Sequence, residues 1–115
     1  MTFRQAADLA EVPVGTSIPV DLGGEDEVAV VNTVDGVFAI RDVCSHAEVP
    51  LSEGDVEGAT IECYMHGSRF DLRTGEPLEL PATQPVPIYP VRIDGTDIYV
   101  DIDNPITNGP SNQEN

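Results

Sequence analysis

The chain of 115 residues carries 21 Asp or Glu side chains against five Arg and no Lys, which gives a formal net charge of −16. Such a surface repels phosphate backbones, so we expect no nucleic-acid partner. No apolar run approaches the roughly 20 residues of a membrane-spanning helix, and residues 1–8 lack the basic-then-apolar order of a signal peptide. We therefore expect a single soluble domain, a monomer located in the cytoplasm.

The first forty residues predict one turn of helix followed by short strands. Residues 3–11 are rich in Ala and predict a short helical turn. β-branched and apolar residues then predict strands at 17–22, 28–33 and 37–41. Asp35-Gly36 stands between the last two and predicts a hairpin, because Gly and Asp tolerate the positive φ of a tight turn.

The rest of the chain predicts more short strands and almost no helix. Residues 49–54 and 56–58 predict a loop and a turn. The strands are predicted at 59–62, 70–72, 91–93 and 98–102. The proline-rich span 77–90 is expected to be extended rather than a central strand, because Pro lacks the N–H that a ladder needs. Asp94-Gly95 predicts a second hairpin, and the polar residues 104–115 predict a flexible tail. This pattern is typical of an all-β sandwich or barrel.

Both cysteines and both histidines of the chain lie in one window of the sequence. Cys44 and His46 are separated by one residue, and Cys63 and His66 by two. Without an export signal a disulfide is not expected, and this spacing favours metal ligation. A zinc finger usually takes two Cys from one end and two His from the other. Here each loop supplies one thiolate and one imidazole, which matches a binuclear iron centre with two Cys on one iron and two His on the other.

The residues around these four side chains carry a family resemblance. The matching residues are Cys44-Ser45-His46, Pro50-Leu51, Gly54, the run from Cys63 to Pro77, Pro81-Ala82 and the run from Val86 to Arg92. With them the chain resembles a Rieske-type [2Fe–2S] ferredoxin, the small soluble ferredoxin component of bacterial oxygenase systems. The doubled Cys/His pattern is highly specific, and the similarity covers all but the two ends of the chain.

The resemblance implies a fold, a cofactor and a function. The fold would be a Rieske β-sandwich or barrel in one domain, residues 1–103, followed by the flexible tail 104–115. Its base would comprise about 1–42 and 82–103, with an inserted cluster-binding lobe at about 43–81. The lobe would bind the [2Fe–2S] cluster through Cys44 and Cys63 on the inner iron and His46 and His66 on the outer iron. The function would be to carry one electron at a time from a flavin-containing, NAD(P)H-dependent ferredoxin reductase to a terminal oxygenase or similar acceptor.

Other residues distinguish the chain from the respiratory branch of the same family. Val49 and Met65 stand where that branch has the two Cys of a bracing disulfide. Ser68 matches a Ser that donates a hydrogen bond to a cluster sulfur, but Phe70 replaces the Tyr that donates a second one. Fewer donors leave the reduced cluster less stabilised. We therefore expect a redox potential toward the low end of the general Rieske range of roughly −150 to +300 mV.

The sequence predicts a carrier rather than an enzyme. An oxygenase also holds a mononuclear iron on two further His and a carboxylate, and this chain has only the two His that the cluster uses. Two alternatives stay open at this point. The same cluster could serve an iron–sulfur assembly accessory or a redox sensor, and the four ligands could instead form a structural zinc site in an interaction module.

The strong acidity also has two explanations, which can hold together. Negative charge confers solubility and suits a salty cytoplasm. It would also steer the protein toward basic docking faces, with association rates that fall as salt rises.

Overall fold

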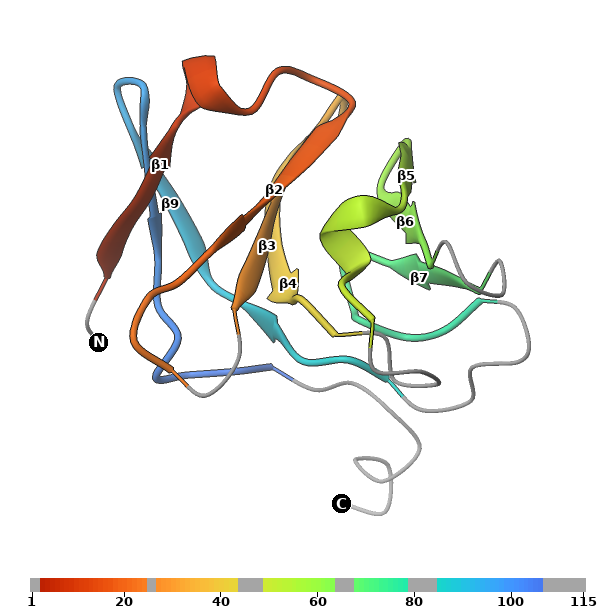
Figure 1. Cartoon of the computed structure of the whole chain (residues 1–115). Helices are drawn as coiled ribbons and strands as arrows, with labels where there is room; N and C mark the ends of the chain where they lie inside the picture. Colours follow the sequence, from red (N-terminus) through yellow and green to blue (C-terminus); the bar gives the residue numbers. More distant parts are fainter. Residues whose placement is uncertain (1–2, 25–26, 44–48, 64–67, 79–84, 107–115) are drawn as a thin grey trace.

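The computed structural model describes residues 3–24, 27–43, 49–63, 68–78 and 85–106. Within them, three antiparallel sheets stand side by side across the molecule (Figure 1). The outer sheet has the order β1 (Arg4–Asp8), β10 (Asp97–Val100), β9 (Val91–Asp94). The middle sheet has the order β2 (Thr16–Val20), β3 (Val28–Thr33), β4 (Gly36–Arg41), β8 (Ile88–Tyr89). The lobe sheet has the order β5 (Asp55–Glu57), β6 (Thr60–Glu62), β7 (Arg69–Asp71). Two 3₁₀ turns, η1 (Leu9–Glu11) and η2 (Leu51–Glu53), complete the elements of the described residues. The all-β prediction is confirmed.

The middle sheet is covered on both faces, and β3 lies at its centre. All six residues of β3 are buried. Val28 and Val30 belong to the base core, between the middle and outer sheets, together with Ala7, Val12, Leu22, Ala39, Ile98 and Val100. Ala29 and Val31 belong to the lobe core, on the other face, together with Ile40, Leu51, Ile61, Cys63, Phe70, Leu72, Val86 and Ile88. Because successive side chains of a strand point to opposite faces, one apolar run supplies both cores.

Both predicted hairpins are confirmed. In the first, Thr33 pairs with Gly36, and in the second, Asp94 pairs with Asp97. Gly36 has a φ of 128° and Gly95 a φ of 67°, whereas no described residue other than Gly has a positive φ. The Gly of each Asp-Gly pair therefore provides the unusual backbone conformation, and Asp35 is not required to do so.

The helical turn predicted for residues 3–11 is wrong for its first half. Arg4–Asp8 forms β1, which pairs with β10, and only Leu9–Glu11 is helical. The side chain of Asp8 accepts a hydrogen bond from the N–H of Ala10 at 2.9 Å, and Glu11 accepts one from the N–H of Asp8 at 3.1 Å. This capping box starts the helical turn at Asp8. The backbone of the residues before Asp8 forms its hydrogen bonds with β10 instead.

The loop and turn predicted at 49–58 contain regular structure. Leu51–Glu53 forms η2, and Asp55–Glu57 forms β5, which pairs with β6 in the register Asp55 to Glu62. The turn between β5 and β6 lies at Gly58 (φ 57°) and Ala59, so only the last residue of the predicted turn 56–58 belongs to it. A strand as short as three residues leaves too few positions to show alternation in the sequence.

The proline-rich span and the chain end meet at the edge of the middle sheet. As predicted, the described part of this span is mostly extended and provides only the two-residue edge strand β8. Ile88 of that strand exchanges two backbone hydrogen bonds with Ile106, at 2.8 and 2.7 Å. Ordered pairing thus continues past residue 104, where the tail was expected to begin, because β8 offers a free edge. Residues 107–115 lie outside the described residues. No helix in the described part of the chain is long and apolar enough to cross a bilayer.

Gly54 provides the first test of how the lobe is packed. A Cβ at this position would lie 1.6 Å from the carbonyl oxygen of Glu62, although the φ of −88° suits any residue. We expect Gly54→Ala to lower the free energy of unfolding by about 3 kcal/mol, because backbone atoms must move apart. Gly58→Ala is the matched control: its φ is +57° and no atom lies within 4 Å of the added Cβ. It should cost only about 1 kcal/mol. Urea unfolding measures both, and equal losses would contradict the close approach.

Candidate metal centre

Cys63 is the one predicted ligand that lies in the described part of the chain. It follows β6 directly, and strand alternation puts it on the same face as Ile61, inside the lobe core. Its side chain is fully buried. A buried thiol among apolar side chains is shielded from water, as the inner ligand of a metal cluster must be.

The other three predicted ligands, Cys44, His46 and His66, lie outside the described residues. So do Met65, Gly67 and Pro81, which are among the residues compared with the family in the sequence. The structure therefore shows how the ligand loops begin and end. Among the described residues, no group of three His, Cys, Asp or Glu side chains could hold a metal ion.

The second ligand loop starts and ends on a pair of adjacent strands. The N–H of Cys63 donates to the carbonyl oxygen of Ser68 at 2.7 Å, directly beyond the pairing of Glu62 with Arg69 in β6 and β7. Four residues, 64–67, complete the connection. A strand pair thus fixes both ends of the segment that contains His66.

The first ligand loop is closed by a buried carboxylate that sequence reasoning missed. Asp42 follows β4, and its carboxylate accepts hydrogen bonds from the N–H of Ser52 at 2.6 Å and from the Ser52 hydroxyl at 2.7 Å. The loop returns at Val49, which packs against the core that contains Cys63. Nothing in the sequence distinguished Asp42 from the other acids, apart from its place between an apolar strand and Cys44.

Two residues compared with the respiratory branch are buried next to Cys63. Ser68 and Phe70 are both fully buried, and Phe70 packs in the lobe core with Cys63. Beyond β7, the N–H of Leu78 donates to the carbonyl oxygen of Arg69 at 2.6 Å, and the N–H of Val86 donates to that of Gly75 at 2.8 Å. The residues on either side of the span 79–84 are therefore tied to β7 and to the segment that follows it.

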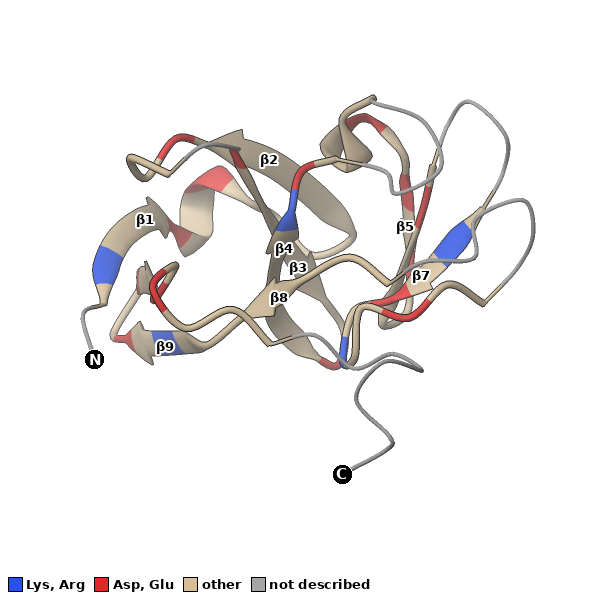
Figure 2. Cartoon of the chain, turned by 90° about the horizontal axis from the view of Figure 1, so that it is seen from below, with Lys and Arg blue, Asp and Glu red and all other residues tan. Residues whose placement is uncertain are grey.

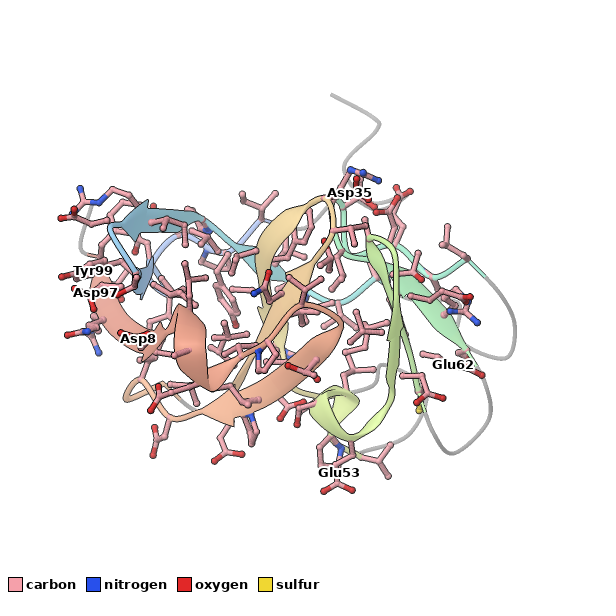
Figure 3. All side chains as sticks on the ribbon, turned by 90° about the horizontal axis from the view of Figure 1, so that it is seen from above. Asp8, Asp35, Glu53, Glu62, Asp97 and Tyr99 are labelled. Carbon is pink, nitrogen blue, oxygen red and sulfur yellow. The ribbon has the colours of Figure 1, made fainter. Side chains whose placement is uncertain are left out.

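The solvent face of the lobe sheet is acidic. Asp55 and Glu62 lie directly opposite each other on β5 and β6. Arg69 lies within 3.3 Å of Glu57 and 3.2 Å of Glu62 and so bridges β5 and β7 across this face. Figure 2 shows this Arg segment on β7 beside the acidic strands, and Figure 3 shows Glu62 directed away from the lobe, at the opposite end of the molecule from Asp8 and Asp97.

Comparison with known proteins identifies the family. The model of the Rieske [2Fe-2S] domain matches residues 3–90. The chain belongs to this family. The 3-phenylpropionate/cinnamic acid dioxygenase ferredoxin subunit of Escherichia coli (strain K12) is 41% identical over 98 residues, covering 84% of this chain and 91% of that protein.

Solved structures of the family show the same fold. The ferredoxin of carbazole 1,9a-dioxygenase from Nocardioides aromaticivorans IC177 is 43% identical, with a TM-score of 0.81, covering 87% of this chain and 97% of that one. A complex of reduced oxygenase and oxidized ferredoxin in carbazole 1,9a-dioxygenase contains a chain that is 32% identical, with a TM-score of 0.79, covering 85% of this chain and 91% of that one.

These findings confirm the predicted family, fold class and cofactor. The cofactor is a Rieske-type [2Fe–2S] cluster, and the chain is an electron-transfer protein rather than an enzyme. The zinc-module alternative is therefore set aside. The residues fit the cluster: the chain contains two Cys and two His, and Cys63 is fully buried, with its N–H bonded to the carbonyl oxygen of the buried Ser68.

Proposed function

We propose that this chain is a soluble, cytoplasmic ferredoxin that passes single electrons from a flavin-containing, NAD(P)H-dependent reductase to the terminal oxygenase of a ring-hydroxylating system. The proposal rests on the similarity of this chain to ferredoxins of such systems, which extends over nearly the full length of each relative. One of these ferredoxins was solved in a complex with its oxygenase. The protein acts as a monomeric carrier.

Four side chains bind the cluster in this proposal. Cys44 and Cys63 bind the inner iron, and His46 and His66 bind the outer iron. The burial of Cys63 in the lobe core supports its place on the inner side. The lobe at about 43–81 holds these ligands, and the base, at about 1–42 and 82–103, supports the lobe through the middle sheet.

The bound cluster supplies a site that accepts and releases one electron. With two ferric ions, two sulfides and two thiolates its oxidised charge is zero, and imidazole ligands make it easier to reduce than a centre with four thiolates. The chain contributes the surroundings. The apolar lobe core excludes water from Cys63, and the buried Ser68 would donate a hydrogen bond to a cluster sulfur.

Substitution of each ligand tests the cluster assignment. We expect Cys44→Ser, Cys63→Ser, His46→Ala and His66→Ala to lose the visible absorbance and the EPR signal of the reduced protein. The wild-type protein should contain two irons and two sulfides per chain, as a [2Fe–2S] cluster requires. Met65→Leu is the control within the same loop and should keep both irons. A colourless wild-type protein that binds zinc would refute the assignment.

Electron transfer can be measured with the oxygenases of the relatives. The reduced protein is mixed with the terminal oxygenase of carbazole 1,9a-dioxygenase or with that of 3-phenylpropionate/cinnamic acid dioxygenase, and cluster reoxidation is followed by stopped-flow absorbance. We expect transfer to at least one oxygenase, slowing as salt screens the acidic surface. The Cys63→Ser apoprotein is the negative control. A cluster that no flavin-dependent reductase reduces and that reduces neither oxygenase would favour a sensor or an assembly accessory.

Substitutions of Ser68 and Phe70 should shift the redox potential of the cluster in opposite directions. A hydrogen bond of about 1.4 kcal/mol that favours the reduced cluster corresponds to about 60 mV for a one-electron couple. Ser68→Ala should therefore lower the midpoint potential by about that much, and Phe70→Tyr should raise it if the hydroxyl donates to a sulfur. Phe38→Tyr, at a partly buried side chain against the same core, is the control. A wild-type potential above the middle of the Rieske range would refute the argument.

A further inference from the structure

Asp42 is a buried acid with two donors directed at its carboxylate. The residue is only 5% exposed. Ser52 donates to one oxygen through its N–H at 2.6 Å and to the other through its hydroxyl at 2.7 Å. The N–H of Asp42 donates in turn to the carbonyl oxygen of Glu27 at 2.9 Å. Hydrogen bonds to an ionised acceptor are stronger than neutral ones, so these contacts join the end of β4 firmly to η2.

Ser52 is held from the other side as well. Its carbonyl oxygen accepts a hydrogen bond from the hydroxyl of Ser17 in β2 at 2.9 Å. The turn η2 is therefore fixed between the carboxylate of Asp42 and the middle sheet. Its neighbour Leu51 is fully buried in the lobe core.

The same turn lies against the backbone that leads to Cys63. Gly54, at the end of η2, approaches the carbonyl oxygen of Glu62 so closely that a Cβ could not fit. Glu62 immediately precedes Cys63, and Leu51 packs in the same core as Cys63. Asp42 immediately precedes Val43 and stands two residues before Cys44. A continuous chain of contacts thus runs from the segment of one cysteine to the segment of the other.

We propose that Asp42 is a positioning residue for the cluster: its carboxylate, through Ser52 and η2, sets the spacing between the two backbone segments that carry Cys44 and Cys63. The inference rests on the proposed ligand set. A bridging cluster tolerates little variation in the distance between its ligands, and a site held within about 0.5 Å needs supporting hydrogen bonds behind the ligands. Asp42 would provide that support through Ser52, which donates to both of its carboxylate oxygens.

The chain offers a matched control for the loss of a buried carboxylate. Asp101 is fully buried and accepts hydrogen bonds from the N–H of Asp103 at 3.0 Å and from the side-chain amide of Asn104 at 2.8 Å. It follows β10 in the base, so its contacts connect no ligand segment. Asp42→Asn and Asp101→Asn remove the same charge from the same kind of site.

The test measures the holoprotein of the wild type, Asp42→Asn, Ser52→Ala and Asp101→Asn. A chelator is added, and bleaching of the visible absorbance gives the rate of cluster loss, at a temperature where all four proteins are folded. We expect Asp42→Asn and Ser52→Ala to lose the cluster about tenfold faster than the wild type, since a charge-assisted hydrogen bond contributes about 1.5 kcal/mol or more. Their visible circular dichroism and EPR spectra should also shift. Asp101→Asn should keep the wild-type rate and spectra even where its thermal unfolding temperature falls.

A double variant tests whether Asp42 acts through Ser52. If it does, Asp42→Asn with Ser52→Ala should lose the cluster no faster than the faster single variant, because the hydroxyl contact that Ser52→Ala removes is one of the two that Asp42→Asn already weakens. The proposal would be overturned if the rate increases of the two single variants multiplied in the double variant. An Asp101→Asn effect as large as that of Asp42→Asn would overturn it as well. If Asp42→Asn does not fold, the spectra and rate of Ser52→Ala decide. A wild-type protein without a cluster would instead refute the proposed function, so the two failures are distinguishable.

Discussion

The burial of β3 on both faces is the constraint on which the rest of the structure depends. Its even-numbered residues Val28 and Val30 pack toward the outer sheet, and its odd-numbered residues Ala29 and Val31 pack toward the lobe. Removing either neighbour would expose one apolar face of the middle sheet to water, at a cost of about 25 cal/mol for each Å² uncovered. The lobe that carries Cys63 is therefore held to the base by the same strand that forms the base core.

Apolar residues on both faces cannot by themselves fix the register of β3, because a slip of one residue would exchange one apolar face for the other. The register of β3 is instead fixed by the polar residues at the end of the strand. The side-chain amide of Asn32 donates to the carbonyl oxygen of Val12 at 2.7 Å, and the hydroxyl of Thr33 donates to that of Gly36 at 2.8 Å. A slip would leave these buried groups without partners, which costs more than an exchange of apolar contacts.

The sequence predicts what depends on neighbouring residues and misses what depends on distant ones. The hairpins were predictable because Asp-Gly determines a turn locally, and the cofactor because all the Cys and His fall in one window. The strand β1 was not predictable, because its partner strand lies at the other end of the chain. The side-chain amide of Gln5 donates a hydrogen bond to Asp97, 92 residues away. Asp42 was missed for a similar reason, because its role appears only when Ser52 is folded back onto it, and no local pattern marks an acid that will be buried. The ligand roles of Cys44, His46, Cys63 and His66 remain predictions from the sequence pattern.

The acids of this chain act in two physically different ways. On the solvent face of the lobe, Asp55 lies opposite Glu62, an arrangement of like charges that weakens a strand pair. Arg69 offsets part of this cost by bonding to Glu57 and Glu62. Charges exposed in this way act over distance, are screened within about 8 Å at physiological salt, and bear on how partners approach. Asp42 is different, because it is withdrawn from water and its two oxygens are occupied by Ser52. Its effect is local geometry, which salt does not screen. We therefore propose association for the exposed acids and ligand spacing for Asp42, and burial with directed donors is what separates the two kinds of acid.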